Sequence, residues 1–438
     1  MRNTPASSLP LAPIFDTLEA RALLAGDLQD IPSDSAFAPY QTVAVVEAPG
    51  DGLIAITERP DGRLGAFVRT RGGWAREDLG AALQGLSVIG AVHAWLTPLG
   101  AVRVAVGVTD PPVSGTGGAY EPGMEVAVLE RGDTGWTLLS FLHTQAFFGN
   151  EDVERLSGDF EVLQRPDGKV VVAGHTALGE IVAYVEPETI GNEPPRNWTY
   201  VNITRRAGFA AGEAPIFGGD VEAFVMPWDG LNIAQASTVD GHVRVYWTPG
   251  GTDDWRLSDL TVDSGAPDFA RLTGASDLES TRTPWGAIQL TGRTDAGHAV
   301  ALWWAPGMER WRSADLTDIT GADASRGIRH ITSMVTPWRS INIVAVNNSG
   351  GVDVFWWLPA SGWRFDTIRG TLNGEPVSFA NLEAASGPNG RLSLVGTPDI
   401  SVDDVRLQEG GDDGERGIFR LGWDLDGTRQ WYLERITG

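Results

Sequence analysis

A tryptophan-marked motif that recurs seven times along the 438 residues constrains this chain more than any other feature. The marker residues are Trp74, Trp136, Trp198, Trp255, Trp311, Trp363 and Trp431, and consecutive markers are 52 to 68 residues apart. An apolar residue follows each marker by five positions, and the position just before that residue is never apolar. A repeat of this period predicts one repeat architecture for the chain rather than several independent domains.

Each repeat also contains strand-like runs upstream of its marker. They are rich in Val, Ile and aromatic residues and are separated by turn residues, a pattern typical of antiparallel hairpins. In the fourth and sixth repeats they are Val221–Pro227, Leu231–Thr238 and His242–Thr248, and Ile331–Pro337, Ile341–Asn347 and Val352–Leu358. Together with the marker strand, they predict an all-β fold, a seven-bladed β-propeller with four antiparallel strands per blade over residues 39–438.

Residues 1–38 differ from the repeats, since they hold several prolines and a short helical-looking patch. Within them Leu18, Glu19, Arg21, Leu23 and Leu24 resemble the LEPR-XLL motif found near the N-terminus of many planctomycete surface and exported proteins, with Ala20 where that motif has proline. The resemblance implies sorting to the cell surface, the periplasm or the extracellular space. The alternative is an amphipathic helix lying on the propeller. Because no strand is left over at either end, we expect the ring to close by blade-on-blade packing or by pairing of residues 1–38 with a sheet edge.

Charge and composition exclude several classes of function. The net charge is −24, with 33 Lys and Arg against 57 Asp and Glu, so nucleic acid and anionic membrane surfaces would repel the chain. There are no cysteines, which excludes disulfides, thiolate metal sites and cysteine nucleophiles. No apolar run is long enough for a transmembrane helix.

Three neighbouring repeats place a Pro-Trp pair at the end of their first strand. The tryptophans are Trp228, Trp285 and Trp338, and Asp229 follows the first of them. An aromatic side chain at such a turn is half buried, and its open face can stack on a sugar ring. We therefore take Trp228, Asp229, Trp285 and Trp338 as candidate ligand-binding residues, which in adjacent blades would add avidity. The alternative is that these tryptophans only wedge between blades.

Other aromatic and histidine residues are interpreted as structural. The doublets Tyr246-Trp247, Trp303-Trp304 and Trp356-Trp357 lie in third strands, where adjacent residues point to opposite faces and pack against both flanking blades. His242 and His298 occupy matching turn-to-strand positions, which indicates repeat structure. No histidine pair has zinc-site spacing, so we expect no metal.

No catalytic constellation or cofactor motif stands out, and the repeats are loosely similar to those of bacterial lectin-type propellers with a Trp-centred strand. The favoured function is an exported or surface-associated, non-catalytic propeller that binds a glycan or a protein on a loop face. One alternative is a glycoside hydrolase or lyase with carboxylates converging on the central channel. The other is a scaffold in a surface protein assembly.

Overall fold

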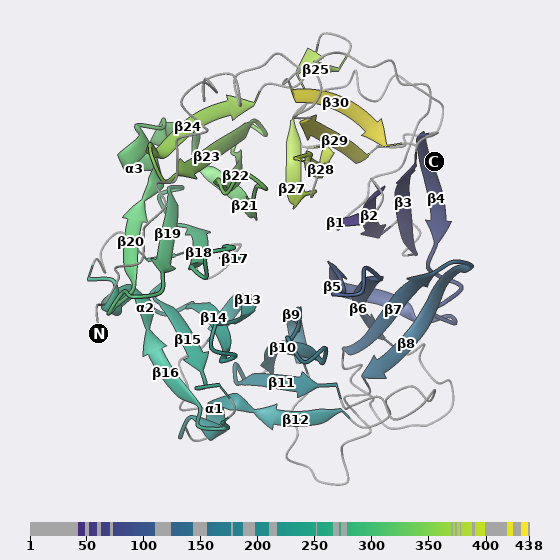
Figure 1. Cartoon of the computed structure of the whole chain (residues 1–438), viewed down its shortest axis with the longest axis horizontal. Coiled ribbons are helices and arrows are strands. Elements are labelled where there is room, and N and C mark those ends of the chain that lie inside the picture. Colours follow the sequence, from purple (N-terminus) through teal and green to yellow (C-terminus); the bar gives the residue numbers. More distant parts are fainter. Residues whose placement is uncertain are drawn as a thin grey trace, which may run out of the picture.

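The computed structural model shows a seven-bladed β-propeller, with seven four-stranded antiparallel sheets set around a common axis (Figure 1). The structure describes residues 43–48, 52–58, 63–70, 73–109, 124–142, 156–176, 178–186, 198–209, 217–250, 252–265, 271–272, 278–368, 371–372, 375–376, 378–387, 390–398, 418–423 and 431–436. The expected leader, residues 1–38, lies outside these residues, and its sorting role stays a prediction.

The chain runs through each blade from the inner to the outer strand. Blades 1 and 2 are β1 (Val43–Ala48), β2 (Gly52–Glu58), β3 (Leu64–Thr70), β4 (Gly73–Asp78), and β5 (Ser87–Leu96), β6 (Val102–Thr109), β7 (Glu125–Gly132), β8 (Gly135–Leu142). Blades 3 and 4 are β9 (Leu156–Gln164), β10 (Val170–Thr176), β11 (Ile181–Val185), β12 (Thr199–Asn202), and β13 (Phe217–Val225), β14 (Leu231–Ser237), β15 (Val243–Trp247), β16 (Arg256–Asp259). Blades 5 and 6 are β17 (Glu279–Arg282), β18 (Ile288–Arg293), β19 (Ala299–Trp304), β20 (Arg312–Asp315), and β21 (Ile328–Val335), β22 (Ile341–Asn347), β23 (Val352–Leu358), β24 (Gly362–Ile368). Blade 7 is β27 (Phe379–Ser386), β28 (Leu392–Pro398), β29 (Ile418–Trp423), β30 (Trp431–Ile436), and β25 (Thr371–Leu372) and β26 (Glu375–Pro376) form a small separate hairpin before it.

Every marker tryptophan lies at the start of its outermost strand or directly before it. In blades 3, 4 and 5 this strand runs into a short helix, α1 (Ile203–Arg206), α2 (Leu260–Asp263) or α3 (Leu316–Thr320). The residue before each helix, Asn202, Asp259 or Asp315, is its N-cap and accepts a hydrogen bond from a free N–H of the first turn. In these three blades, the polar residue and the apolar residue that follow each marker in the repeat are therefore the N-cap of a helix and the buried residue after it. No helix in the described part of the chain is long and apolar enough to cross a membrane.

The turn between the first and second strands has the same backbone in six blades. Its first residue donates to the carbonyl of the fifth, and its fourth residue has a positive φ. These left-handed residues are Gly100, Gly168, Asp229, Gly286, Arg339 and Gly390. Proline stands at the second position of each turn, where its fixed φ suits the type I turn that precedes a left-handed residue. The tryptophans of the Pro-Trp pairs occupy the third position, at the tip.

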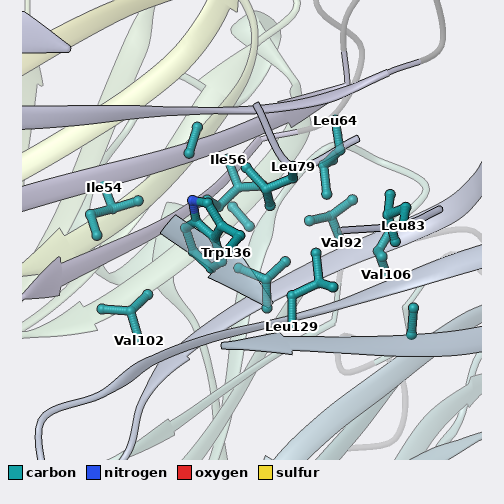
Figure 2. Close-up of a cluster of buried hydrophobic side chains, with 14 of the residues drawn as sticks. Ile54, Ile56, Leu64, Leu79, Leu83, Val92, Val102, Val106, Leu129 and Trp136 are labelled. Carbon is teal, nitrogen blue, oxygen red and sulfur yellow. The ribbon is translucent and has the colours of Figure 1, made fainter. Parts of the chain in front are cut away.

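The apolar core lies between the blades. The cluster at the boundary of blades 1 and 2 joins Ile54 and Ile56 of β2 to Val106 of β6, Leu129 of β7 and Trp136 of β8 (Figure 2). Comparable clusters span the other boundaries. Each sheet is therefore buried on both faces, which explains the nearly continuous apolar runs of its central strands.

An ionic clamp reinforces the boundary of blades 1 and 2. Arg131 of β7 donates to Glu77 of β4 at 2.6 and 2.9 Å, and the indole N–H of the marker Trp136 donates to the same carboxylate at 2.8 Å. The hydrogen bond from Arg131 holds the pKa of Glu77 below its usual value. The marker tryptophan thus links two blades as well as filling the core.

The ring closes with a copy of the same clamp. Trp74 donates its indole N–H to Glu434 of blade 7 at 2.8 Å, and Arg69, which pairs with Trp74 in the sheet, lies 3.7 Å from that carboxylate. Glu434 also contacts Arg420, which is fully buried and donates to Ser393. Blade-on-blade contact therefore joins the two ends of the ring, which is the first of the two expected routes; the second, pairing of residues 1–38 with a sheet edge, lies outside the described residues.

Candidate functional site

One position in the sheet of each blade determines which side chain that blade presents to the preceding blade; we call it the register position. This position lies within one residue of the end of the third strand. In blades 1, 2, 6 and 7 it is paired with the marker tryptophan of the fourth strand, and in the other blades it directly follows the last pair before the marker. Around the ring it is occupied by Arg69, Arg131, Glu186, Thr248, Trp304, Trp357 and Trp423. Arginine at this position makes the ionic clamps of blades 1 and 2. Tryptophan in blades 5, 6 and 7 makes three consecutive aromatic boundaries instead.

At the boundary of blades 4 and 5, the turn tryptophan of blade 4 meets the strand tryptophan of blade 5. Trp228 stands edge-on to Trp304, with ring centres 5.2 Å apart and planes at 89°. Trp304 is fixed because its indole N–H donates to the carbonyl of Met308 at 3.0 Å. Trp228 nevertheless keeps 46% of its surface exposed. It rests on the neighbouring blade by one side only, as expected for a tip residue.

The backbone around Trp228 is held closely. A Cβ added to Gly250, in the turn between the third and fourth strands of the same blade, would lie 2.0 Å from the carbonyl oxygen of Trp228. Only glycine therefore allows the two turns of blade 4 to touch. The indole is presented by a rigid support.

The boundary of blades 5 and 6 repeats this arrangement with a different tilt. Trp285 and Trp357 lie 6.1 Å apart with planes at 36°, and both are partly exposed. At the boundary of blades 6 and 7, Trp338 is partly exposed and packs against the buried cluster that contains Trp423. All three Pro-Trp tryptophans therefore retain exposed surface, and Trp228 and Trp285 contact a tryptophan of the next blade.

Asp229 adjoins a different boundary from Trp228. Its left-handed backbone turns the side chain toward blade 3, where its carboxylate lies 3.3 Å from the guanidinium of Arg165 in the equivalent turn. The candidate residues Trp228 and Asp229 are neighbours in sequence but belong to two different blade boundaries.

Trp304 and Trp357, interpreted from sequence as packing residues only, are the partners of the turn tryptophans Trp228 and Trp285. An alignment of all seven third strands on the marker tryptophan would have revealed them.

Blade 2 provides a non-aromatic version of the same turn. Leu99 occupies the tip and is 97% exposed, and the register position of the next blade holds Glu186, whose pKa is raised by burial. The turn by itself therefore does not create an aromatic site. The combination of a tip tryptophan and a strand tryptophan is confined to blades 4 to 7.

Carboxylates occur on the innermost strands, and several of them share one repeated position. In blades 3, 4, 5 and 7 a glutamate lies four residues before the turn that joins the first and second strands: Glu161, Glu222, Glu279 and Glu383. In blade 2 the same position holds His93. Glu161 lies 3.4 Å from His93, and Glu222 accepts a hydrogen bond from the backbone N–H of Ser280 in the next blade at 3.0 Å. These contacts join neighbouring blades. Glu47 of β1 lies outside this repeated position: it accepts a hydrogen bond from Ser393 of blade 7 at 3.1 Å, and burial raises its pKa.

The paired histidines have equivalent contacts. The Nδ1 atoms of His242 and His298 each lie 2.7 Å from the N-cap aspartate of their blade, Asp259 or Asp315. In blade 5, Asp318 joins this pair, and the three groups could hold a metal ion; blade 4 has Val262 in place of Asp318. The shared His-Asp contact ties the second turn to the short helix, which is the repeat role expected from sequence.

No protein-family model and no curated protein matches this chain. Among solved structures, the BP39L lectin from Burkholderia pseudomallei is similar with a TM-score of 0.56 and 12% identity, over 92% of this chain and 100% of that one. AofleA from Arthrobotrys oligospora has a TM-score of 0.45 and 13% identity, over 93% and 89%. The six-bladed Aleuria aurantia lectin has a TM-score of 0.44 and 12% identity, over 78% and 99%. At these identities the likeness shows the fold alone.

Proposed function

We propose that this protein is an exported or surface-associated, non-catalytic propeller that binds carbohydrate at the aromatic boundaries of blades 4 to 7. The observation that carries the proposal is the Trp228–Trp304 pair, in which one indole is fixed and the other keeps nearly half of its surface open. A rigid, half-open indole provides an apolar face on which a sugar ring can stack with little loss of conformational entropy.

Repetition of the pair supports the same function. The Trp228 and Trp285 sites occupy equivalent turns of neighbouring blades and therefore lie on one face of the propeller. Two or three weak sites on one face gain avidity for a branched or polymeric glycan without any new contact. The fold shared with the BP39L lectin is an analogy that favours carbohydrate among the ligand classes.

A glycan array probed with the purified full chain tests the proposal. We expect binding to at least one glycan class, and loss of most of that signal in the double variant Trp228→Ala/Trp285→Ala. Leu99→Ala is the matched control, because it truncates the same turn position in a blade that has no aromatic pair. An array without signal, or equal loss in the control, contradicts the proposal.

The export part of the proposal rests on the LEPR-XLL resemblance of residues 18–24. Residues 1–38 fused to a reporter protein should direct the reporter out of the cytoplasm of a planctomycete host. The same fusion with Leu23→Asp and Leu24→Asp should leave it inside. Export of both fusions would show that this motif is not the signal.

A further inference from the structure

In blades 4 and 5 the left-handed residue of the first turn faces the boundary with the preceding blade. Asp229 of blade 4 shows this directly, since its carboxylate reaches Arg165 of blade 3. In blade 5, a Cβ added to Gly286 would lie 3.4 Å from Cγ of Pro227, in the Pro-Trp turn of blade 4. By the repeat, the same position in blade 6 borders the turn that carries Pro284 and Trp285.

That position in blade 6 is Arg339. Its φ is +65°, a left-handed conformation that is unfavourable for a residue with a Cβ. Four equivalent turns avoid this cost with glycine, and Asp229 offsets it with its ion pair. Arg339 is exposed, and its guanidinium makes no hydrogen bond or ion pair with any residue that the structure describes. No contact within the described fold accounts for a strained arginine here.

The boundary that Arg339 borders is the aromatic one formed by Trp285 and Trp357. At the Trp228–Trp304 boundary the same place is held by Gly286, and at the Trp338 boundary by Gly390. The aromatic boundaries therefore share their indoles but differ in charge. A guanidinium binds a carboxylate through two parallel hydrogen bonds, and this geometry gives specificity as well as affinity.

We propose that the boundary of blades 5 and 6 binds an acidic sugar, with the ring of a uronic acid on Trp285 and its carboxylate on Arg339. The boundary of blades 4 and 5, where Gly286 replaces the arginine, binds neutral sugars only. This assignment rests on the proposed carbohydrate-binding function and adds a specificity to one of its sites. It also accounts for a strained residue in an otherwise regular turn.

The test uses two ligands that differ only at one carboxyl group, methyl α-galacturonoside and its methyl ester, titrated calorimetrically into the full chain. We expect the acid to bind about tenfold more tightly than the ester, the effect of one charge-assisted contact of about 1.4 kcal/mol. Arg339→Gly should abolish the preference, so that acid and ester bind with equal affinity. Arg364→Gln, which removes another exposed arginine of blade 6, should retain the preference.

The outcomes separate the two proposals. Equal affinity for acid and ester, or a preference that survives Arg339→Gly, overturns the role of Arg339 while the carbohydrate-binding function stands. No binding of either ligand, together with an empty glycan array, overturns both. Because glycine is favoured at this backbone position, misfolding of the Arg339→Gly variant cannot mimic the expected loss.

Discussion

At the scale of single residues, the left-handed residue of the first turn affects both the stability of the fold and the proposed ligand binding. Asp229 and Arg339 are two of the three residues other than glycine that have a positive φ in the described chain. The sequence already shows Pro-Trp pairs followed by Asp, Gly and Arg, and from it the tryptophans could be placed at half-buried tips. The direction of Asp229 toward blade 3 could not be predicted, because it depends on the backbone of the turn and on the position of the neighbouring blade.

Arg339→Gly is expected to stabilise the protein by about 1 kcal/mol, because glycine adopts this conformation without the clash of a Cβ. Arg339→Ala keeps the Cβ and should leave stability near that of the wild type. Thermal unfolding of the three proteins measures the difference. Equal gains for both variants would show that removal of the charge, rather than relief of the backbone, is responsible.

Trp228→Ala should cost about 1–2 kcal/mol, because the side chain is already half exposed and loses only part of the burial of an aromatic residue. Trp431→Ala should cost about 3–5 kcal/mol, the usual range for truncating a fully buried tryptophan. Denaturant unfolding of both variants distinguishes a ligand platform from a packing wedge. Similar losses in the two would favour the wedge.

At the scale of secondary-structure elements, the strand pattern was predictable in detail where turns are short. The sixth repeat was expected to hold strands at Ile341–Asn347 and Val352–Leu358, and these are the bounds of β22 and β23. The helices α1, α2 and α3 were not predicted, since elements of four or five residues show no apolar periodicity. Their caps were nevertheless visible as the polar position before each buried apolar residue.

The clamp between β4 and β7 predicts a pH-dependent stability. Because the pKa of Glu77 is lower in the folded protein than in the unfolded chain, its contribution is full above the ordinary glutamate pKa and is lost as the pH falls through the lowered folded value. Glu77→Gln should therefore cost about 1–2 kcal/mol near neutral pH and progressively less below about pH 4. Melting curves of wild type and variant between pH 3 and 8 test this, and a difference that does not shrink in acid would contradict it.

At the scale of the whole molecule, ionic clamps lie at the two boundaries on either side of blade 1, and tryptophan occupies the register position at the three boundaries from blade 4 to blade 7. The seven-blade count followed from the markers alone, because each marker opens or directly precedes one outer strand. The division into ionic and aromatic boundaries could not be predicted, because it depends on pairing positions more than 300 residues apart, such as Trp74 with Glu434.

Closure should be the more sensitive of the two clamped boundaries. Glu434→Gln keeps an acceptor for the indole N–H of Trp74 but removes the negative charge that the buried Arg420 and Arg69 face, so we expect a cost of about 3 kcal/mol, the range for breaking a buried pair. Glu77→Gln is the matched variant at the boundary of blades 1 and 2, which are consecutive in the chain, and it should reduce stability by less. Equal losses of stability for the two variants in thermal unfolding would show that the closing boundary is no more sensitive than the boundary of blades 1 and 2.

The most direct test of the central claim, that the open indoles of blades 4 to 6 bind sugar, is an NMR titration of the tryptophan indole N–H signals with a glycan selected from the array. The account predicts shifts for the tip tryptophans Trp228, Trp285 and Trp338 and for their strand partners Trp304 and Trp357. It predicts none for the seven marker tryptophans, whose side chains lie between blades. Shifts confined to other tryptophans, or no shift at a saturating glycan concentration, would contradict it.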